Sequence, residues 1–212
     1  MPLSPGFSGN AEKARKKGFS TRDMVQVALF ALLVAVGTFI RLPLPFSPVP
    51  ITLQTAVVLA AGLMLGANKA AAALLTYLCM GLLGLPVFTG GGGFHSLLLP
   101  SFGFIVGFVP AAWLVGRIQE FFAQQGSATG SGLLRSACAC LAGILVYDTV
   151  GILWLHMNLN YVLANDVPFS KTLALGLLPF LLPDLLKLAA VVSLAAMLAR
   201  RAQAGNAIPR SH

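Results

Sequence analysis

The sequence predicts an all-α membrane protein, a compact bundle of six transmembrane helices. Charged side chains are scarce: 9% of the 212 residues are Asp, Glu, Lys or Arg, while 57% are hydrophobic. A soluble domain carries roughly 25% charged residues, so this chain could not cover its surface in water. Long apolar stretches also alternate with prolines, glycines and short polar turns. These features exclude a cytosolic enzyme, a secreted disulfide scaffold and a disordered chain.

Six stretches approach the roughly 20 apolar residues that a helix needs to cross a bilayer. We expect spans at residues 24–40, 51–66, 70–85, 97–122, 133–156 and 172–200. Four prolines between Pro43 and Pro50 end the first span, and a polar turn around Asn68 separates the second from the third. Pro179 and Pro183 are expected to break the first part of the last span.

The distribution of cations predicts the orientation and the domain boundaries. We expect a basic cytoplasmic tail at residues 1–23, one membrane domain at residues 24–200 and a cytoplasmic tail at residues 201–212. With both termini inside, eleven of the fourteen Lys and Arg residues fall in inner segments, whereas only Arg41 and Lys171 fall outside. This is the positive-inside pattern of a protein in a lipid bilayer. The net charge of +8 therefore does not indicate nucleic-acid binding.

Away from the ends of the predicted spans, three charged side chains lie within the apolar part, where charges are costly and usually functional. Asp148 lies in the fifth span, and Asp184 and Lys187 lie in the sixth. We expect Pro183 to open a helix, which places Asp184 near a helix N-terminus and Lys187 on the same face one turn later. The pair could be an intrahelical ion pair or a ligand clamp. Asp148 could hydrogen-bond within the bundle, assist a cavity or partner Lys187.

Two further segments fall on the same outer side. Thr52 and Gln54 open the second span, where Thr52 could cap a helix and the Gln54 amide could pair with a ligand amide. Four glycines at residues 90–93 follow Phe88 and permit either a flexible loop or a close approach of backbone to ligand. The sequence contains no GxxxxGK[ST] motif, so the chain cannot be its own P-loop ATPase. No metal site is expected either.

Four motifs together resemble the BioY family. They are PVPITLQT at residues 48–55, GLPVF at 84–88 before the glycines, PSFGF at 100–104 and LPFLLPDLLK at 178–187. They occur in the family's order between about residues 27 and 199. BioY proteins are the biotin-binding substrate components, or S components, of energy-coupling factor (ECF) transporters.

The resemblance implies a biotin pocket toward the outer face of a bacterial inner-membrane protein. Asp184 would accept hydrogen bonds from the ureido N–H groups of biotin, and Lys187 would meet a ureido or valerate oxygen. We assign to the same site Thr52, Gln54, Phe88, Gly91, Gly92 and Tyr147. No cofactor is expected, since biotin is the transported substrate.

The small-residue stripe of the first span has two alternative uses. Ala31 and Ala35 lie one helical turn apart, so they permit close approach of another helix, either within the bundle or from a separate subunit. The resemblance implies docking to a transmembrane coupling subunit, which connects to two ATPase subunits.

Two rival functions come from other classes. An intramembrane aspartyl protease could use Asp148 and Asp184, but its Gly-x-Gly-Asp motif is missing and Lys187 disfavours a shared proton. A self-sufficient secondary carrier for another vitamin or small amide is the closer alternative. Against it, the six spans show no internal inverted repeat.

Overall fold

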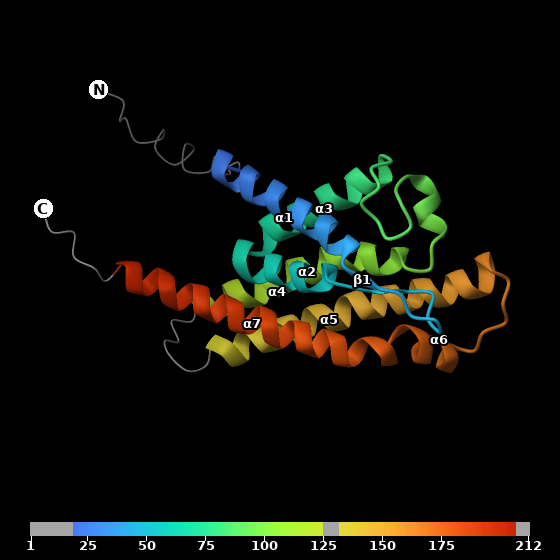
Figure 1. The fold of residues 1–212 in the computed structure, drawn as a ribbon. Helices are drawn as coiled ribbons and strands as arrows, with labels where there is room; N and C mark the ends of the chain where they lie inside the picture. The colour runs from blue at the N-terminus through green and yellow to red at the C-terminus, as the bar shows by residue number, and fades with distance from the viewer. Residues whose placement is uncertain (1–18, 125–131, 207–212) are drawn as a thin grey trace, which may run out of the picture.

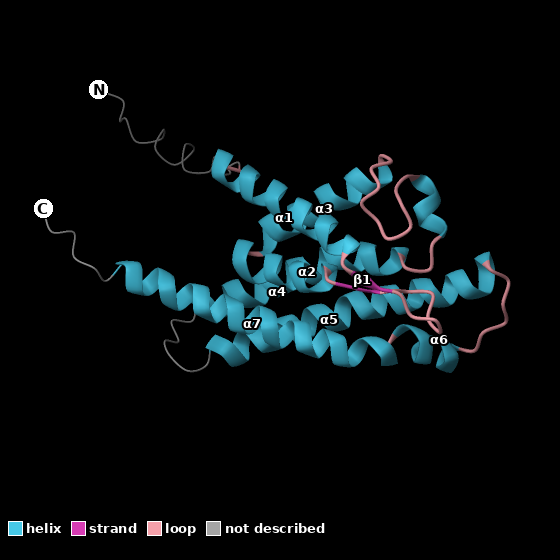
Figure 2. Cartoon of the chain, in the orientation of Figure 1, coloured by secondary structure: helices cyan, strands magenta, loops and turns pink. Residues whose placement is uncertain are grey.

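The computed structural model describes residues 19–124 and 132–206, and its regular structure is almost entirely helical (Figure 2). The elements are α1 (Thr21–Phe39), β1 (Arg41–Leu42), β2 (Ile51–Thr52), α2 (Gln54–Leu65), α3 (Ala67–Leu82), the 3-10 helix η1 (Phe94–Leu98), α4 (Phe102–Gln124), α5 (Gly132–Met157), the π-helical turn η2 (Asn158–Val162), α6 (Phe169–Gly176) and α7 (Leu178–Asn206). The all-α fold expected from the sequence is confirmed. The two strands form a two-residue antiparallel ladder that closes the proline-rich loop after α1.

The helices differ in how much of a bilayer they can cross. Within the described residues, four stretches are long and apolar enough to span: Thr21–Phe39, Phe102–Gln124, Gly132–Val162 and Phe169–Arg201. The 12 residues of α2 and the 16 of α3 reach only about 18 and 24 Å at 1.5 Å per residue. Gly66, with a φ of +80°, turns the chain directly from one into the other. The second and third predicted spans are therefore a pair of short helices.

Several predicted boundaries are wrong, and each difference has a local cause. The second span begins at Gln54, because the residues before it pair as β2. The fourth begins at Phe102, after the break at Pro100. The last is interrupted at Leu177, whereas Pro183 lies inside α7 and does not open it. At position 183 a proline removes one intrahelical hydrogen bond, and α7 continues through it.

The position of Pro183 also changes the electrostatic setting of its neighbour. Since α7 begins at Leu178, Asp184 lies beyond the first turn of the helix. The helix dipole acts mainly within that turn, so the predicted dipole stabilisation of Asp184 does not apply. Its negative charge must be stabilised by other groups.

Glycines bring α4 and α5 into close contact at the level of the site. A Cβ atom added to Gly107 on α4 would lie 2.9 Å from the Cα atom of Tyr147 on α5. A Cβ on Gly151 of α5 would overlap the ring of Phe104 on α4. The absence of side chains at both positions therefore sets how near Tyr147 stands to α4.

The start of α1 and the end of α7 lie at one end of the bundle, and the β1–β2 loop and the α3–α4 connection lie at the other (Figure 1). Both ends of the predicted membrane domain, residues 24 and 200, fall inside helices, since α1 begins at Thr21 and α7 continues to Asn206. Most of the predicted basic tail lies outside the described residues. We call the end that carries the two loops the loop end.

Candidate substrate-binding site

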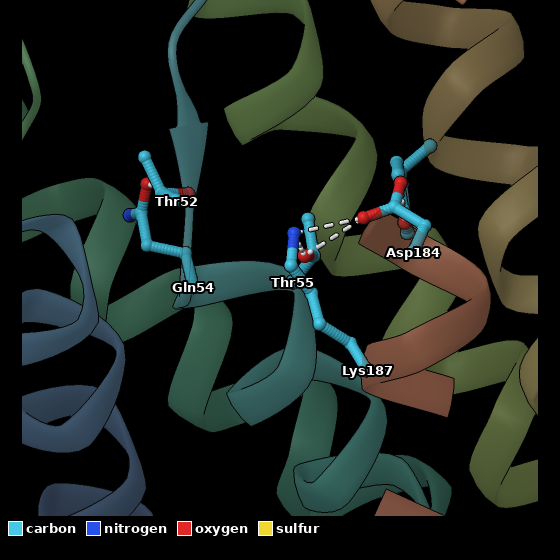
Figure 3. A network of polar contacts seen from close by, with 6 residues as sticks. Thr52, Gln54, Thr55, Asp184 and Lys187 are labelled. Atoms are coloured by element: carbon cyan, nitrogen blue, oxygen red, sulfur yellow. Dashed lines mark hydrogen bonds and ion pairs between the residues drawn. The ribbon is translucent and has the colours of Figure 1, made fainter. Parts of the chain in front are cut away.

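Asp184 is the point where three helices meet. Lys187, one turn further along α7, places its Nζ 2.9 Å from Asp184 Oδ1, and the two side chains are only 13% and 5% exposed. Thr55 on α2 accepts a hydrogen bond from Lys187 at 2.9 Å and donates to Asp184 Oδ1 at 3.4 Å (Figure 3). The Tyr147 hydroxyl on α5 donates to Asp184 Oδ2 at 2.8 Å. The carboxylate is thus held by three donors from three helices.

A second polar group surrounds Gln54 at the start of α2. Its Nε2 donates to the Tyr77 hydroxyl at 2.6 Å, and its Oε1 accepts from Thr52 Oγ1 at 3.3 Å. Tyr77 in turn donates to the Val87 carbonyl at 3.0 Å. Gln54 and Thr52 are 3% and 8% exposed, so this network is buried and the orientation of the amide is fixed. Figure 3 shows Thr52, Gln54 and Thr55 at the junction of β2 and α2, with Asp184 and Lys187 facing Thr55 from α7.

Residues of both polar groups line one cavity. Its other side is an aromatic wall formed by Phe104, Phe108 and Phe180. Its lining comprises Val49, Pro50, Thr52, Gln54, Thr55, Thr89, Ser101, Phe104, Ile105, Phe108, Tyr147, Asp148, Phe180, Asp184 and Lys187. Phe104 stacks on Phe180 with ring centroids 6.2 Å apart, which joins α4 to α7 across the wall. A mainly apolar hollow with a few convergent polar groups is the usual form of a small-molecule site.

The cavity is narrow in this structure. Its volume is about 40 Å³, whereas ligand pockets usually measure about 300–1,000 Å³. A second hollow of about 330 Å³ at the loop end shares Pro50, Thr89 and Ser101 with it and also includes Arg41. A ligand larger than a few water molecules can therefore enter only if the walls between these two spaces separate.

Asp148 lies on α5 beside Tyr147 and lines the same cavity. It is 6% exposed, and its Oδ1 has no hydrogen-bond partner within the described residues. No ion pair joins it to Lys187 in that part of the chain, so the predicted partnership with Lys187 is not formed. The other predicted role, a hydrogen bond within the bundle, is not formed by Oδ1 among the described residues either.

The glycine run is used to fold a loop against α3. Gly91 pairs with Phe88 in an isolated bridge and has a φ of +106°, while a Cβ on Gly92 would overlap the Leu85 carbonyl. The Phe88 ring packs edge-on against Tyr77 with centroids 5.4 Å apart. Phe88, Gly91 and Gly92 do not line the cavity, so direct ligand contact by these three residues stays a prediction.

Five of the predicted site residues do meet at the cavity: Thr52, Gln54, Tyr147, Asp184 and Lys187. Sequence reasoning missed Thr55, which bridges the ion pair, and Tyr77, which orients Gln54. Thr55 directly follows Gln54, so its presence in the same motif was an available signal. Tyr77 lies within an apolar helix, and nothing in its neighbourhood along the chain marks it.

The small-residue stripe faces inward. Ala31 and Ala35 are 1% and 3% exposed and belong to the core, where α1 packs on α2 and α3. In this arrangement they serve the internal packing that the sequence left as one alternative. Their docking to a separate subunit stays a prediction, and it would require α1 to move or the partner to contact neighbouring residues.

Comparison with known proteins places this chain in a family. A sequence profile of the BioY family matches residues 11–204. The chain belongs to the BioY family. A probable biotin transporter BioY of Lysinibacillus sphaericus is 36% identical over 78% of this chain and 80% of its own length. The biotin transporter BioY of Rhizobium etli is 37% identical over 88% of this chain and 95% of its own length.

A solved structure extends the comparison to the fold. A crystal structure of the S component for biotin from an ECF-type ABC transporter matches with a TM-score of 0.74 and 26% identity. The match covers 86% of this chain and 95% of the solved chain. The arrangement of helices is therefore that of a membrane S component.

Proposed function

We propose that this chain is the biotin-binding component of a vitamin uptake transporter. The observation that carries the proposal is the buried Asp184–Lys187 pair, which lines a cavity in a chain whose relatives are biotin transporters. The cavity shares Pro50, Thr89 and Ser101 with the hollow at the loop end, which lies opposite the start of α1 and the end of α7 (Figure 1). With both termini in the cytoplasm, that end faces outward and biotin is captured from outside.

The unused hydrogen-bonding capacity of the site fits biotin. A carboxylate accepts about four hydrogen bonds, and three donors already bond to Asp184, which leaves a place for one ureido N–H. Lys187 uses two of its three donors on Asp184 and Thr55 and keeps one for a ureido or valerate oxygen. The aromatic wall contacts the apolar ring system and thioether of biotin.

Pre-orientation of these groups supports selective binding. Lys187 and Asp184 are fixed by each other and by Thr55 before a ligand arrives, so binding orders few side chains. A ligand that fails to match the buried polar atoms leaves them unpaired, at about 1–3 kcal/mol each. Close apolar analogues without the cyclic urea are therefore rejected.

Entry requires the loop end to open. The Arg41 guanidinium donates to the Thr89 carbonyl and so ties the β1–β2 loop to the α3–α4 connection. Thr89 and Pro50, one from each segment, line both the cavity and the larger hollow outside it. Separation of these two segments joins the spaces into a pocket of vitamin size.

Energy for transport comes from separate subunits. The sequence has no P-loop, and the solved structural relative belongs to an ECF-type ABC transporter. The partners are a transmembrane coupling subunit and two ATPase subunits in a bacterial inner membrane, and the chain itself is not an enzyme. Ala31 and Ala35 on α1 are candidate docking residues for a state in which α1 has moved away from α2 and α3.

The contacts of Asp184 weigh against the aspartyl protease. In such an enzyme two carboxyl groups share a proton across a water molecule. Here Asp184 is bonded to Lys187, Thr55 and Tyr147, and no hydrogen bond joins it to Asp148 within the described residues. This arrangement supports binding and not hydrolysis.

Binding and uptake can be tested separately. The purified chain should bind biotin in a calorimetric titration, and mass spectrometry should find biotin among co-purifying small molecules. Proteoliposomes that contain the chain with an ECF module should take up labelled biotin when ATP is inside. Retention of a different vitamin would contradict the proposal, and ATP-independent uptake by the chain alone would favour a secondary carrier.

A further inference from the structure

Asp148 is a buried carboxyl group for which the proposed function has no task. The residue is 6% exposed, and its Oδ1 has no hydrogen-bond partner within the described residues. A buried polar atom without a partner costs about 1–3 kcal/mol, so nearly all such atoms in proteins are paired. We therefore expect Asp148 Oδ1 to gain a hydrogen-bond partner in the functional state of the protein.

The position of Asp148 shows from which side that partner can come. On one side it lines the cavity together with Asp184 and Lys187. On the other side it borders a hollow of about 500 Å³ between α5, α6 and α7, whose lining is apolar except for Thr149 and the two aspartates. Among the described residues that line that hollow, the only side-chain donor is Thr149, whose hydroxyl already donates to the Leu145 carbonyl at 2.6 Å. The partner must therefore come through the cavity.

The two aspartates that line the cavity differ in how many hydrogen bonds they accept. Asp184 already accepts from Lys187, Thr55 and Tyr147, whereas the Oδ1 of Asp148 accepts from none of the described residues. Asp184 can take one more donor, and Asp148 offers a free oxygen on the same cavity. Two acceptors on one wall suit a ligand with two N–H groups, such as a cyclic urea.

We propose that Asp148 contacts the ligand directly and accepts a hydrogen bond from one N–H group of a cyclic urea, while Asp184 accepts from the other. This inference rests on the proposed function and adds a specificity-determining residue to the same site. A neutral carboxyl group retains a carbonyl oxygen as acceptor, so the assignment holds in either protonation state of Asp148.

Substitution of Asp148 separates this role from a structural one. In Asp148→Leu, biotin affinity should fall about tenfold or more, because the buried acceptor is lost. The melting temperature of the ligand-free variant should stay unchanged or rise, since an unpaired buried group is removed. If Asp148 only stabilised the bundle, Asp148→Leu would lower the melting temperature and leave biotin affinity unchanged. Thr149→Val, the next position on α5, is the matched control and should change neither quantity.

Methylated ligands identify the hydrogen bond itself. Biotin methylated on either ureido nitrogen should be titrated into the wild-type protein and Asp148→Leu. For one of the two isomers the affinity difference between the proteins should disappear, since the N–H that Asp148 contacts is absent. A crystal structure of the wild-type protein with biotin should place an Asp148 oxygen about 2.7–3.2 Å from a ureido nitrogen.

The outcomes distinguish a failure of the proposed function from a failure of the inference about Asp148. No biotin binding by the wild-type protein would overturn the proposed function and this inference with it. Wild-type binding together with unchanged affinity in Asp148→Leu would overturn only the inference. An Asp148 carboxyl group well beyond hydrogen-bond distance from the bound ligand would do the same, even if the Leu variant failed to fold.

Discussion

Replacement of Asp184 by Asn tests the centre of the site. Asp184 accepts from Lys187 at 2.9 Å on one oxygen and from Tyr147 at 2.8 Å on the other. Asn carries one oxygen and one NH₂ group, so in either orientation an N–H faces one of these donors. With its oxygen toward Lys187 and its NH₂ group toward Tyr147, the Asn side chain keeps a hydrogen bond to Lys187 without a charged acceptor, and the Tyr147 hydroxyl must change from donor to acceptor.

The magnitude follows from the burial of the pair. Asp184 and Lys187 are 5% and 13% exposed, and removal of one partner from a buried pair costs about 3–5 kcal/mol of stability. The ligand also loses a correctly placed charged acceptor, worth about 1.5–3 kcal/mol, so biotin affinity should fall at least about tenfold. Thermal unfolding and calorimetric titration of the purified variant measure the two effects.

Asp23 provides a matched control. It forms an ion pair with Lys69 at 3.0 Å, nearly the same distance, but both side chains are 29% exposed and Asp23 lies in the first turn of α1, at the opposite end from the loops. Asp23→Asn should leave biotin affinity unchanged, because water screens such pairs and the cavity is remote. Equal effects of the two substitutions would refute the assignment of Asp184 to the site.

Three further substitutions probe the groups that hold the site. Tyr147→Phe removes the donor to Asp184 Oδ2 and should weaken biotin binding about fivefold in a titration, for a loss of about 1 kcal/mol; an unchanged dissociation constant would contradict this. Gln54→Leu should weaken binding about tenfold, and normal affinity would remove its amide from the site. Gly107→Ala places a Cβ 2.9 Å from the Cα atom of Tyr147 and should lower the melting temperature by several degrees, whereas Gly132→Ala, whose added Cβ has no atom of the described residues within 4 Å, should not.

Much of the site could be predicted because its residues follow simple rules. Asp184 and Lys187 are three positions apart, and helix geometry alone puts them on one face. Charges inside apolar spans are rare enough to indicate function without any structure. Thr52 and Gln54 were found through a motif that precedes a span. Tyr77 could not be found in this way, because its hydroxyl meets Gln54 only after two short helices pack.

The chain alone determined the membrane environment, the helical class, the family resemblance and the acid–base pair, because these depend on composition and on spacing within one helix. Tertiary packing decided the features that do not follow from the spacing of residues along the chain. It shortened α2 and α3, kept Pro183 inside α7 and turned Ala31 and Ala35 inward. Asp148 shows the difference most clearly, since a buried oxygen becomes unpaired only when every neighbouring helix fails to supply a donor.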